Sequence, residues 1–229
     1  MTTGDSVLIR GPRPNFPLVS ASTYRFMAGG IGITPIVTMI RAAELEGTPW
    51  TLLYGGRSRD SMAFLDELAQ YGDRVCIVPE DEQGRLPLQD WLALPEPDSL
   101  VYCCGPPGLL DAVEQQCATW PSGSLHIERF TPREVGAPVL DEPFEVELVK
   151  TGTTIVVEPG TSILDAVARS GVPTLSACQE GTCGTCETAV LEGIPEHRDS
   201  VLDDEERAAN DYMMICVSRS LTPRLKLDL

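Results

Sequence analysis

The sequence predicts a doubly wound α/β domain with a parallel sheet, followed by a smaller α+β domain. Over residues 21–130, short apolar runs alternate with amphipathic stretches, which is typical of a parallel sheet with helices on both faces. This periodicity disappears over 131–143, where prolines and a glycine interrupt the chain, so we expect a linker there. The second domain, 144–229, opens with a strictly alternating segment. The 229 residues, 42% of them hydrophobic, are enough to bury two cores.

The secondary-structure elements follow from the positions of apolar residues, prolines and glycines. Pro35 falls in the first turn of its helix, where a missing amide donor costs nothing. Thr151 and Gly152 are expected to form a hairpin turn, and Ser162 is expected to cap a helix that Gly171 ends. We expect strands at 25–28, 50–54, 74–78, 100–104, 125–129, 144–150 and 153–157, and helices at 34–45, 61–70, 109–119 and from 162 to 169.

Residues 1–20 fit neither domain. One strand could run over 5–10, and the prolines that follow it keep the chain extended. A single strand is not a domain, so we interpret this segment as the end of a domain that is missing.

The charge of the chain argues against two classes of partner. Acidic residues number 34 against 17 basic ones, a formal net charge of −17, which would repel nucleic acid and anionic lipid surfaces. The chain contains no apolar run of about 18 residues, and its first residues lack the pattern of a signal peptide. We therefore expect a cytoplasmic protein that binds neither nucleic acid nor membranes.

Four of the eight cysteines have the spacing of a metal site. Cys178, Cys183 and Cys186 form a C-x4-C-x2-C pattern, and Cys216 follows 30 residues later. This is the plant-type [2Fe-2S] spacing, and the glycines and threonines between these cysteines would let the backbone wrap a cluster. The alternative is a structural zinc site, which usually pairs two C-x2-C units, whereas only one occurs here. The remaining cysteines, for which we expect core positions, are Cys76, Cys103, Cys104 and Cys117.

Three segments at the carboxyl ends of expected strands suit a nucleotide. The segment AGGIGITP at 28–35 joins a strand to a helix, where glycines let backbone amides approach a pyrophosphate. GGRSRD at 55–60 occupies the usual place for contacts to an adenosine ribose, and CGPPG at 104–108 opens another helix. Arg57 and Arg59 could instead be solvated loop charges.

Together these motifs resemble the phthalate dioxygenase reductase family. Its complete members run from a flavin domain through a nicotinamide domain to a plant-type, β-grasp ferredoxin domain, and some are fused behind a cytochrome P-450. The resemblance covers residues 5–229, except that the flavin barrel is absent apart from a final strand within 5–18. The matching segments are AGGIGITP at 28–35, YGGRSR at 54–59, CGPPGLL at 104–110, HIERF at 126–130, CQEGTCGTC at 178–186, HRDSVL at 197–202 and MICVSRS at 214–220.

The resemblance implies a nicotinamide site and a contact to flavin. Phe130 matches an aromatic residue that packs near the flavin ring, although a core phenylalanine closing the sheet is an equal alternative. The residues implied at the nucleotide are Gly30, Gly32, Thr34 and Pro35 at the pyrophosphate, Arg57, Ser58 and Arg59 on the adenosine side, and Cys104, Gly105 and Pro106 beside the nicotinamide.

The implied function is electron transfer from NAD(P)H, with a slight preference for NADH, through FMN and the [2Fe-2S] cluster to a Rieske oxygenase or a cytochrome P-450. FMN is expected only in the complete protein, because a hydride must be split into single electrons before a cluster can take them. The electron steps need no acid–base residue, so His126 and His197 are expected to be structural. Acidic residues predominate after 136, which implies a basic surface on the acceptor. The alternative is a non-enzymatic electron carrier with a vestigial nucleotide domain.

Overall fold

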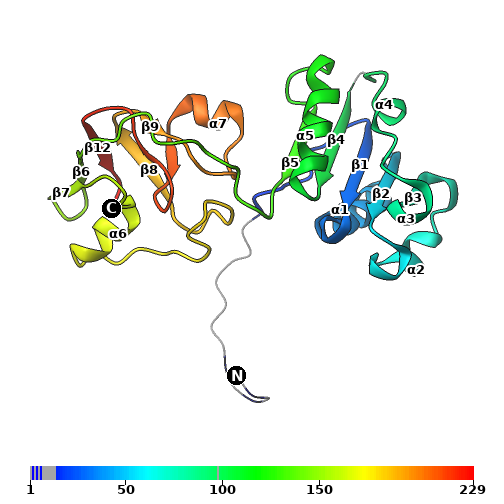
Figure 1. Cartoon of the computed structure of the whole chain (residues 1–229), viewed down its shortest axis with the longest axis horizontal. Helices are drawn as coiled ribbons and strands as arrows, with labels where there is room; N and C mark the ends of the chain where they lie inside the picture. Colours follow the sequence, from blue (N-terminus) through cyan, green and yellow to red (C-terminus); the bar gives the residue numbers. More distant parts are fainter. Residues whose placement is uncertain (1, 3, 5, 7–13, 97) are drawn as a thin grey trace.

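The computed structural model describes residues 2, 4, 6, 14–96 and 98–229, and Figure 1 shows them as two domains joined by irregular chain. The strand expected at 5–10 falls almost wholly outside these residues. No helix in the described ranges combines the length and the apolar character needed to cross a membrane.

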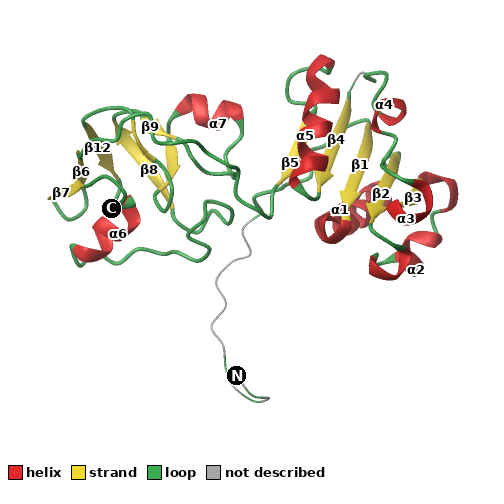
Figure 2. Cartoon of the chain, viewed as in Figure 1, coloured by secondary structure: helices red, strands yellow, loops and turns green. Residues whose placement is uncertain are grey.

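The first domain is a parallel sheet with helices on both faces, which confirms the expected fold class (Figure 2). The strand order is β3-β2-β1-β4-β5, and every neighbouring pair is parallel. The strands are β1 (Thr23–Gly29), β2 (Trp50–Gly56), β3 (Val75–Pro79), β4 (Ser99–Cys104) and β5 (Leu125–Glu128), and the helices are α1 (Ile33–Glu46), α2 (Leu65–Ala69), α3 (Glu80–Gln83), α4 (Leu88–Trp91) and α5 (Pro107–Gln116).

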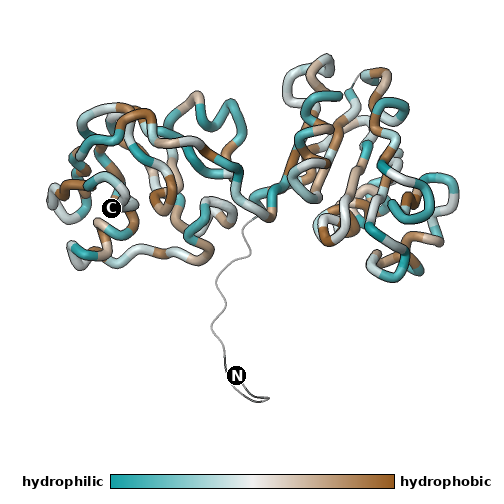
Figure 3. The backbone as a smooth tube through the Cα atoms, viewed as in Figure 1, coloured by the Kyte–Doolittle hydropathy of each residue, from teal (hydrophilic) through white to brown (hydrophobic). Residues whose placement is uncertain are grey.

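Side chains that alternate along β1 build a separate core on each face of this sheet. Phe26 packs with Ile36 and Ile40 of α1, whereas its neighbour Met27 packs with Leu110 of α5 on the opposite face. Both strand side chains are fully buried. Figure 3 shows the hydrophobic residues following the strands of both domains, as expected for sheets with covered faces.

The prediction of a helix at 61–70 is wrong over its first half, because α2 begins only at Leu65. Phe64 adopts a left-handed φ of 63°, and Met62 is extended, so no helix can run through them. Met62 is 7% exposed and joins the core beneath α1. It lies directly over Gly56, where an added Cβ would be 2.3 Å from Met62 Cγ. Burial of Met62 therefore outweighs the helical pattern of the sequence.

The second domain has an antiparallel hairpin, a short helix and a mixed sheet of order β10-β8-β12-β6-β7. Ser162 accepts a hydrogen bond from the Asp165 N–H at 3.0 Å, which confirms the expected helix cap. The sequence patterns did not predict the elements after 187. The elements are β6 (Phe144–Leu148), β7 (Thr153–Val157), α6 (Ile163–Arg169), β8 (Glu187–Glu192), β9 (Pro195–Glu196), α7 (Asp204–Ala209), β10 (Tyr212–Met214), β11 (Arg219–Ser220) and β12 (Arg224–Leu227).

The segment between β5 and β6 contains no helix or strand, but it is not a free tether. It lies along residues 196–200 of the second domain, attached at intervals of three residues. The hydrogen bonds join the Arg133 N–H to Ser200 Oγ at 2.8 Å, the Arg198 guanidinium to the Gly136 carbonyl at 2.6 Å, and the Val139 N–H to the Glu196 carboxylate at 3.3 Å. Most of this linker therefore belongs physically to the second domain.

Candidate nucleotide and cluster sites

The glycine loop after β1 packs backbone to backbone against the turn after β4. A Cβ on Gly32 would lie 2.1 Å from the carbonyl oxygen of Cys104, and one on Gly29 would lie 2.6 Å from Pro106 Cδ. Gly30 differs, because it has a left-handed φ of 55° and a Cβ there would meet nothing within 4 Å. Gly32 is thus required for packing, whereas Gly30 leaves its backbone open to a ligand. The structure therefore brings the predicted glycines together with Cys104, Gly105 and Pro106.

Helix α1 starts directly after the turn Gly30–Gly32, and the N–H of its first residue, Ile33, donates to carbonyls of that turn. Pro35 is the third residue of the helix, so its missing donor is one of the four that have no partner within the helix. The Thr34 hydroxyl donates to the Ile31 carbonyl at 2.9 Å and closes the turn that leads into the helix. The positive end of the helix dipole at this turn suits a phosphate group.

The two arginines after β2 have different surroundings. Arg59 Nε lies 3.0 Å from Glu82 Oε1 in an ion pair. Arg57 is exposed, and its guanidinium has no partner among the described residues. Ser58 forms a reciprocal cap with Ser61 that fixes this turn. Of the two guanidinium groups, only that of Arg57 is available to a ligand without breaking an existing ion pair.

At the end of β5, Phe130 is 46% exposed, so the core interpretation of this side chain is wrong. Its neighbour Arg129 is the buried one, and it pairs with Glu114 of α5 at 2.8 Å. The phenyl ring of Phe130 is left at the surface, where another aromatic group can pack on it.

Burial changes the acid–base behaviour of two groups beside the loop. Cys104 and Glu128 are cross-strand neighbours on β4 and β5. Burial, together with the charge of Glu128, raises the pKa of the Cys104 thiol to about 12, so this thiol stays protonated at neutral pH. Burial likewise raises the pKa of Glu128.

We expect Glu128→Gln to raise the thermal unfolding temperature at pH 7. Because the folded state raises the pKa of Glu128, its contribution to stability is greatest below the unfolded value of about 4.3 and is lost as pH rises through the folded value. The thermal unfolding temperatures of the wild type and of Glu128→Gln should therefore agree near pH 4 and diverge towards pH 8. Glu46→Gln, at an exposed acid of α1, is the control. An equal rise in unfolding temperature in Glu128→Gln and Glu46→Gln would show that burial of the Glu128 carboxylate is not the cause.

The four cysteines of the predicted cluster site come together in two pairs. The Cys178 side chain contacts that of Cys183, and the Cys186 side chain contacts that of Cys216. Within the described residues, no group of three or more His, Cys, Asp or Glu side chains is arranged around a single ion. Two pairs of thiols fit a cluster of two irons better than one zinc ion, because each iron needs two of the four thiolates.

Backbone amides of the loop point at these sulfurs. Peptide N–H groups of Glu180 and Thr182 lie 3.4 and 3.5 Å from Cys178 Sγ. Burial raises the pKa of Cys178, but hydrogen bonds from Thr182 and Glu180 outweigh it and bring the pKa to about 6. The hydrogen bond to Cys216 lowers the pKa of Cys186 to about 7 and raises that of Cys216. The donor set is thus suited to thiolate ligands.

The loop rests on a second segment that the sequence analysis did not assign a role. A Cβ on Gly181 would lie 3.1 Å from the Asp199 Cα, and the Ser200 N–H donates to the Gly181 carbonyl at 2.8 Å. Asp199 is 2% exposed and accepts hydrogen bonds from the N–H groups of Val201 and Leu202. The motif HRDSVL contained both residues, but their contact with residue 181 depends on tertiary structure.

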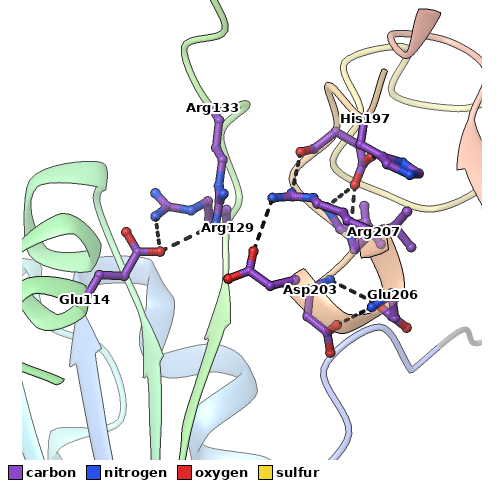
Figure 4. A network of polar contacts seen from close by, with 11 residues as sticks. Glu114, Arg129, Arg133, His197, Asp203, Glu206 and Arg207 are labelled. Carbon is purple, nitrogen blue, oxygen red and sulfur yellow. Dashed lines mark hydrogen bonds and ion pairs between the residues drawn. The ribbon is translucent and has the colours of Figure 1, made fainter. Parts of the chain in front are cut away.

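A polar network lies between the two domains (Figure 4). Glu114 of α5 pairs with Arg133 at 3.4 Å, and Arg207 of α7 donates to the Asp199 carbonyl at 2.9 Å. Burial, followed by the positive charges of Arg207 and Arg129, lowers the pKa of Arg133. Arg133 therefore lies among charges of both domains.

The two histidines have structural surroundings. His126 stacks on Tyr102 with ring centroids 4.6 Å apart, and burial lowers its pKa against the opposing effect of Asp203. His197 Nε2 lies 3.1 Å from Asn210 Oδ1. Neither histidine lies in the glycine loop or the cysteine loop, which fits the structural roles expected for them.

Two family descriptions match separate parts of the chain. The oxidoreductase NAD-binding domain matches residues 26–115, and the 2Fe-2S iron-sulfur cluster binding domain matches residues 146–221. The first range contains the glycine loop and the turn after β4. The second range contains all four cysteines of the paired site.

Curated relatives are similar over nearly the whole chain. The chain is 46% identical over 228 residues to the phenoxybenzoate dioxygenase subunit beta of Ectopseudomonas oleovorans, covering 99% of this chain and 71% of that protein. It is 37% identical over 232 residues to the phthalate dioxygenase reductase of Burkholderia cepacia, with the same coverage.

Solved structures resemble both domains together. An intact type IV self-sufficient cytochrome P450 monooxygenase matches with a TM-score of 0.90 and 41% identity over 99% of this chain. This chain spans only 31% of that protein. Phthalate dioxygenase reductase matches with a TM-score of 0.58 and 36% identity, covering 93% of this chain and 68% of that one.

Proposed function

The chain belongs to the phthalate dioxygenase reductase family, and from this we propose that it is the part of an oxygenase reductase that binds the nicotinamide nucleotide and carries electrons through a [2Fe-2S] cluster. The observation that carries the proposal is the presence in one chain of a glycine loop at the carboxyl edge of a parallel sheet and of two cysteine pairs. The first suits a dinucleotide, and the second suits two irons.

In the second domain, the paired cysteines would each supply a thiolate to the cluster. When bound, the cluster takes up and releases one electron at a time. The amides of Glu180 and Thr182 would stabilise negative charge on the Cys178 sulfur, as hydrogen bonds to sulfur do in such sites. The proposed ligands are Cys178, Cys183, Cys186 and Cys216.

In the first domain, the nucleotide would lie across the edge formed by the glycine loop and the turn after β4. The first amides of α1 would bind its pyrophosphate, and the protonated Cys104 thiol adds no charge beside the nicotinamide. The proposed contacts are Gly30, Gly32, Thr34 and Pro35, then Arg57, Ser58 and Arg59, and finally Cys104, Gly105 and Pro106.

Phe130 is proposed to face the flavin of the complete protein. A nicotinamide gives up two electrons as a hydride, and FMN would divide them for the cluster. The ring of Phe130 is exposed beyond β5, where it can support a flavin without first leaving a core. This role depends on FMN in a domain that the sequence motifs of this chain do not supply.

We propose NADH as the preferred nucleotide. Arg59 is already paired with Glu82, and Asp60 is exposed beside it, where it can accept from a ribose hydroxyl. Arg57 is the one guanidinium in this turn that could bind a 2′-phosphate without losing an ion pair. Arg57→Ala should therefore weaken the binding of NADPH more than that of NADH, and titration of both nucleotides measures the difference.

The proposed electron acceptor is a Rieske-type oxygenase or a cytochrome P-450 domain with a basic docking surface. Several relatives are named as reductase subunits of dioxygenase or monooxygenase systems. Acidic side chains outnumber basic ones more than twofold from residue 136 onward, and Asp203 to Glu206 lie exposed at the start of α7. Complementary charge steers such encounters.

Nucleotide titration of the purified chain tests this function. We expect calorimetry to detect NADH binding. Under anaerobic conditions, we expect dithionite to bleach the visible absorption of the cluster, and we expect NADH alone to leave that absorption unchanged. Without a bound flavin the hydride would have no acceptor, because a one-electron cluster cannot take it directly. Absence of binding by NADH and NADPH would support the non-enzymatic carrier instead. Rapid bleaching by either nucleotide would mean that this chain holds a working flavin site.

A further inference from the structure

The cluster site is open on one side only. Cys186 and Cys216 are 5% and 8% exposed, whereas Cys178 and Cys183 are each partly exposed. Electron transfer favours short paths, so a protein that gives electrons to the cluster or takes them from it gains by approaching the side of Cys178 and Cys183. Donor and acceptor would then compete for one face.

That face is already contacted by the segment that leads into β1. The Asn15 side-chain amide donates to the Cys183 carbonyl at 3.0 Å. The same side chain covers Gly184, where an added Cβ would lie 3.0 Å from Asn15 Nδ2. Gly184 has a left-handed φ of 68°, so a glycine here gives both the loop conformation and the close approach of Asn15.

The segment that carries Asn15 is anchored on the first domain. The Phe16 ring packs on Tyr102 with centroids 5.4 Å apart, and the Val19 N–H donates to the Tyr102 hydroxyl at 2.7 Å. Tyr102 is fully buried in β4. Asn15 is therefore held in place by the first domain while its amide reaches the cluster loop of the second.

We infer that Asn15 is a positioning residue that docks the cluster loop on the first domain, and that this docked state and the complex with the electron acceptor use the same face and exclude each other. The inference rests on the proposed function, since it needs a cluster in this loop. Loss of the Asn15 contact should free the face for an acceptor without changing the cluster itself.

The test is electron delivery from the reduced chain to oxidised cytochrome c, a basic one-electron acceptor protein, followed by stopped-flow absorption. Asn15→Ala should raise the second-order rate constant of electron transfer to cytochrome c about two- to tenfold, because the loss of one net hydrogen bond shifts an equilibrium by about this factor. The midpoint potential of the cluster should stay unchanged. Pro14→Ala, at an exposed neighbour, should behave as wild type, and Asn15→Gln, which keeps an amide donor, should restore part of the wild-type rate.

Three outcomes would decide against the inference. An Asn15→Ala rate equal to wild type, or an increase that a shifted midpoint potential accounts for, overturns the docking role alone. An equal increase in Pro14→Ala would assign the effect to the segment and not to the Asn15 amide. A wild-type chain without the electron paramagnetic resonance signal of a reduced [2Fe-2S] cluster overturns the proposed function, and the inference with it.

Discussion

Replacement of Cys216 by serine is expected to remove the visible absorption of the cluster and its reduced-state electron paramagnetic resonance signal. Two irons need four thiolates, and Cys216 is the only one of the four that comes from outside the 178–186 loop. The Cys216 side chain contacts that of Cys186, so Cys216→Ser would remove one of the two thiolates that this pair would supply to an iron. The same result is expected for Cys178→Ser, Cys183→Ser and Cys186→Ser.

Cys117→Ser is the matched control for this series. Cys117 is 7% exposed, close to the 8% of Cys216, but it lies in the core of the first domain. Its substitution should cost stability and leave both cluster signals intact. Signals that survive unchanged in any one of the four ligand variants would show that the substituted cysteine is not a ligand.

Gly32→Ala is expected to abolish nucleotide binding and to lower the free energy of unfolding of the first domain by about 1–3 kcal/mol, the usual cost of overpacking. The added methyl would lie 2.1 Å from the Cys104 carbonyl oxygen, and neither backbone can turn aside as a side chain could. The glycine loop and the turn after β4 must therefore separate. Calorimetric titration with NADH and thermal unfolding measure the two effects.

Two further glycines serve as comparisons. The Cβ added by Gly136→Ala would meet no atom within 4 Å, so this variant should change neither nucleotide binding nor the unfolding temperature appreciably. Gly30→Ala also has space, but its φ of 55° costs about 1–2 kcal/mol for any L-residue. Gly32→Ala and Gly30→Ala should keep the cluster signals, because the proposed cluster site lies in the other domain. Gly136→Ala should keep them because its added Cβ meets nothing. Normal NADH binding by Gly32→Ala would show that the packing of these two loops does not shape the nucleotide site.

Patterns of neighbouring residues predicted the helices and strands whose apolar spacing and end residues lie within a short stretch of chain. The strands of both domains before residue 158 lie within two residues of their expected ends. Pro35 lies in the first turn of α1, as expected, and Gly47, with a left-handed φ of 71°, ends this helix. The prediction of a helix at 61–70 was wrong over its first half because Met62 is buried against Gly56. The spacing of apolar residues in a helix cannot reveal a contact with a residue outside that helix.

The sequence alone predicted the residues of both proposed sites, because they are recognised by spacing: three cysteines within nine positions, and glycines between a strand and a helix. Contacts between distant residues decided the rest. Only the tertiary structure paired Arg59 with Glu82, exposed Phe130 and placed Asn15 on the Cys183 carbonyl, 168 positions away along the chain. The Arg59 pair and the exposure of Phe130 depend on how the first domain folds, and the Asn15 contact depends on how the two domains lie together. No local period of the sequence encodes either arrangement.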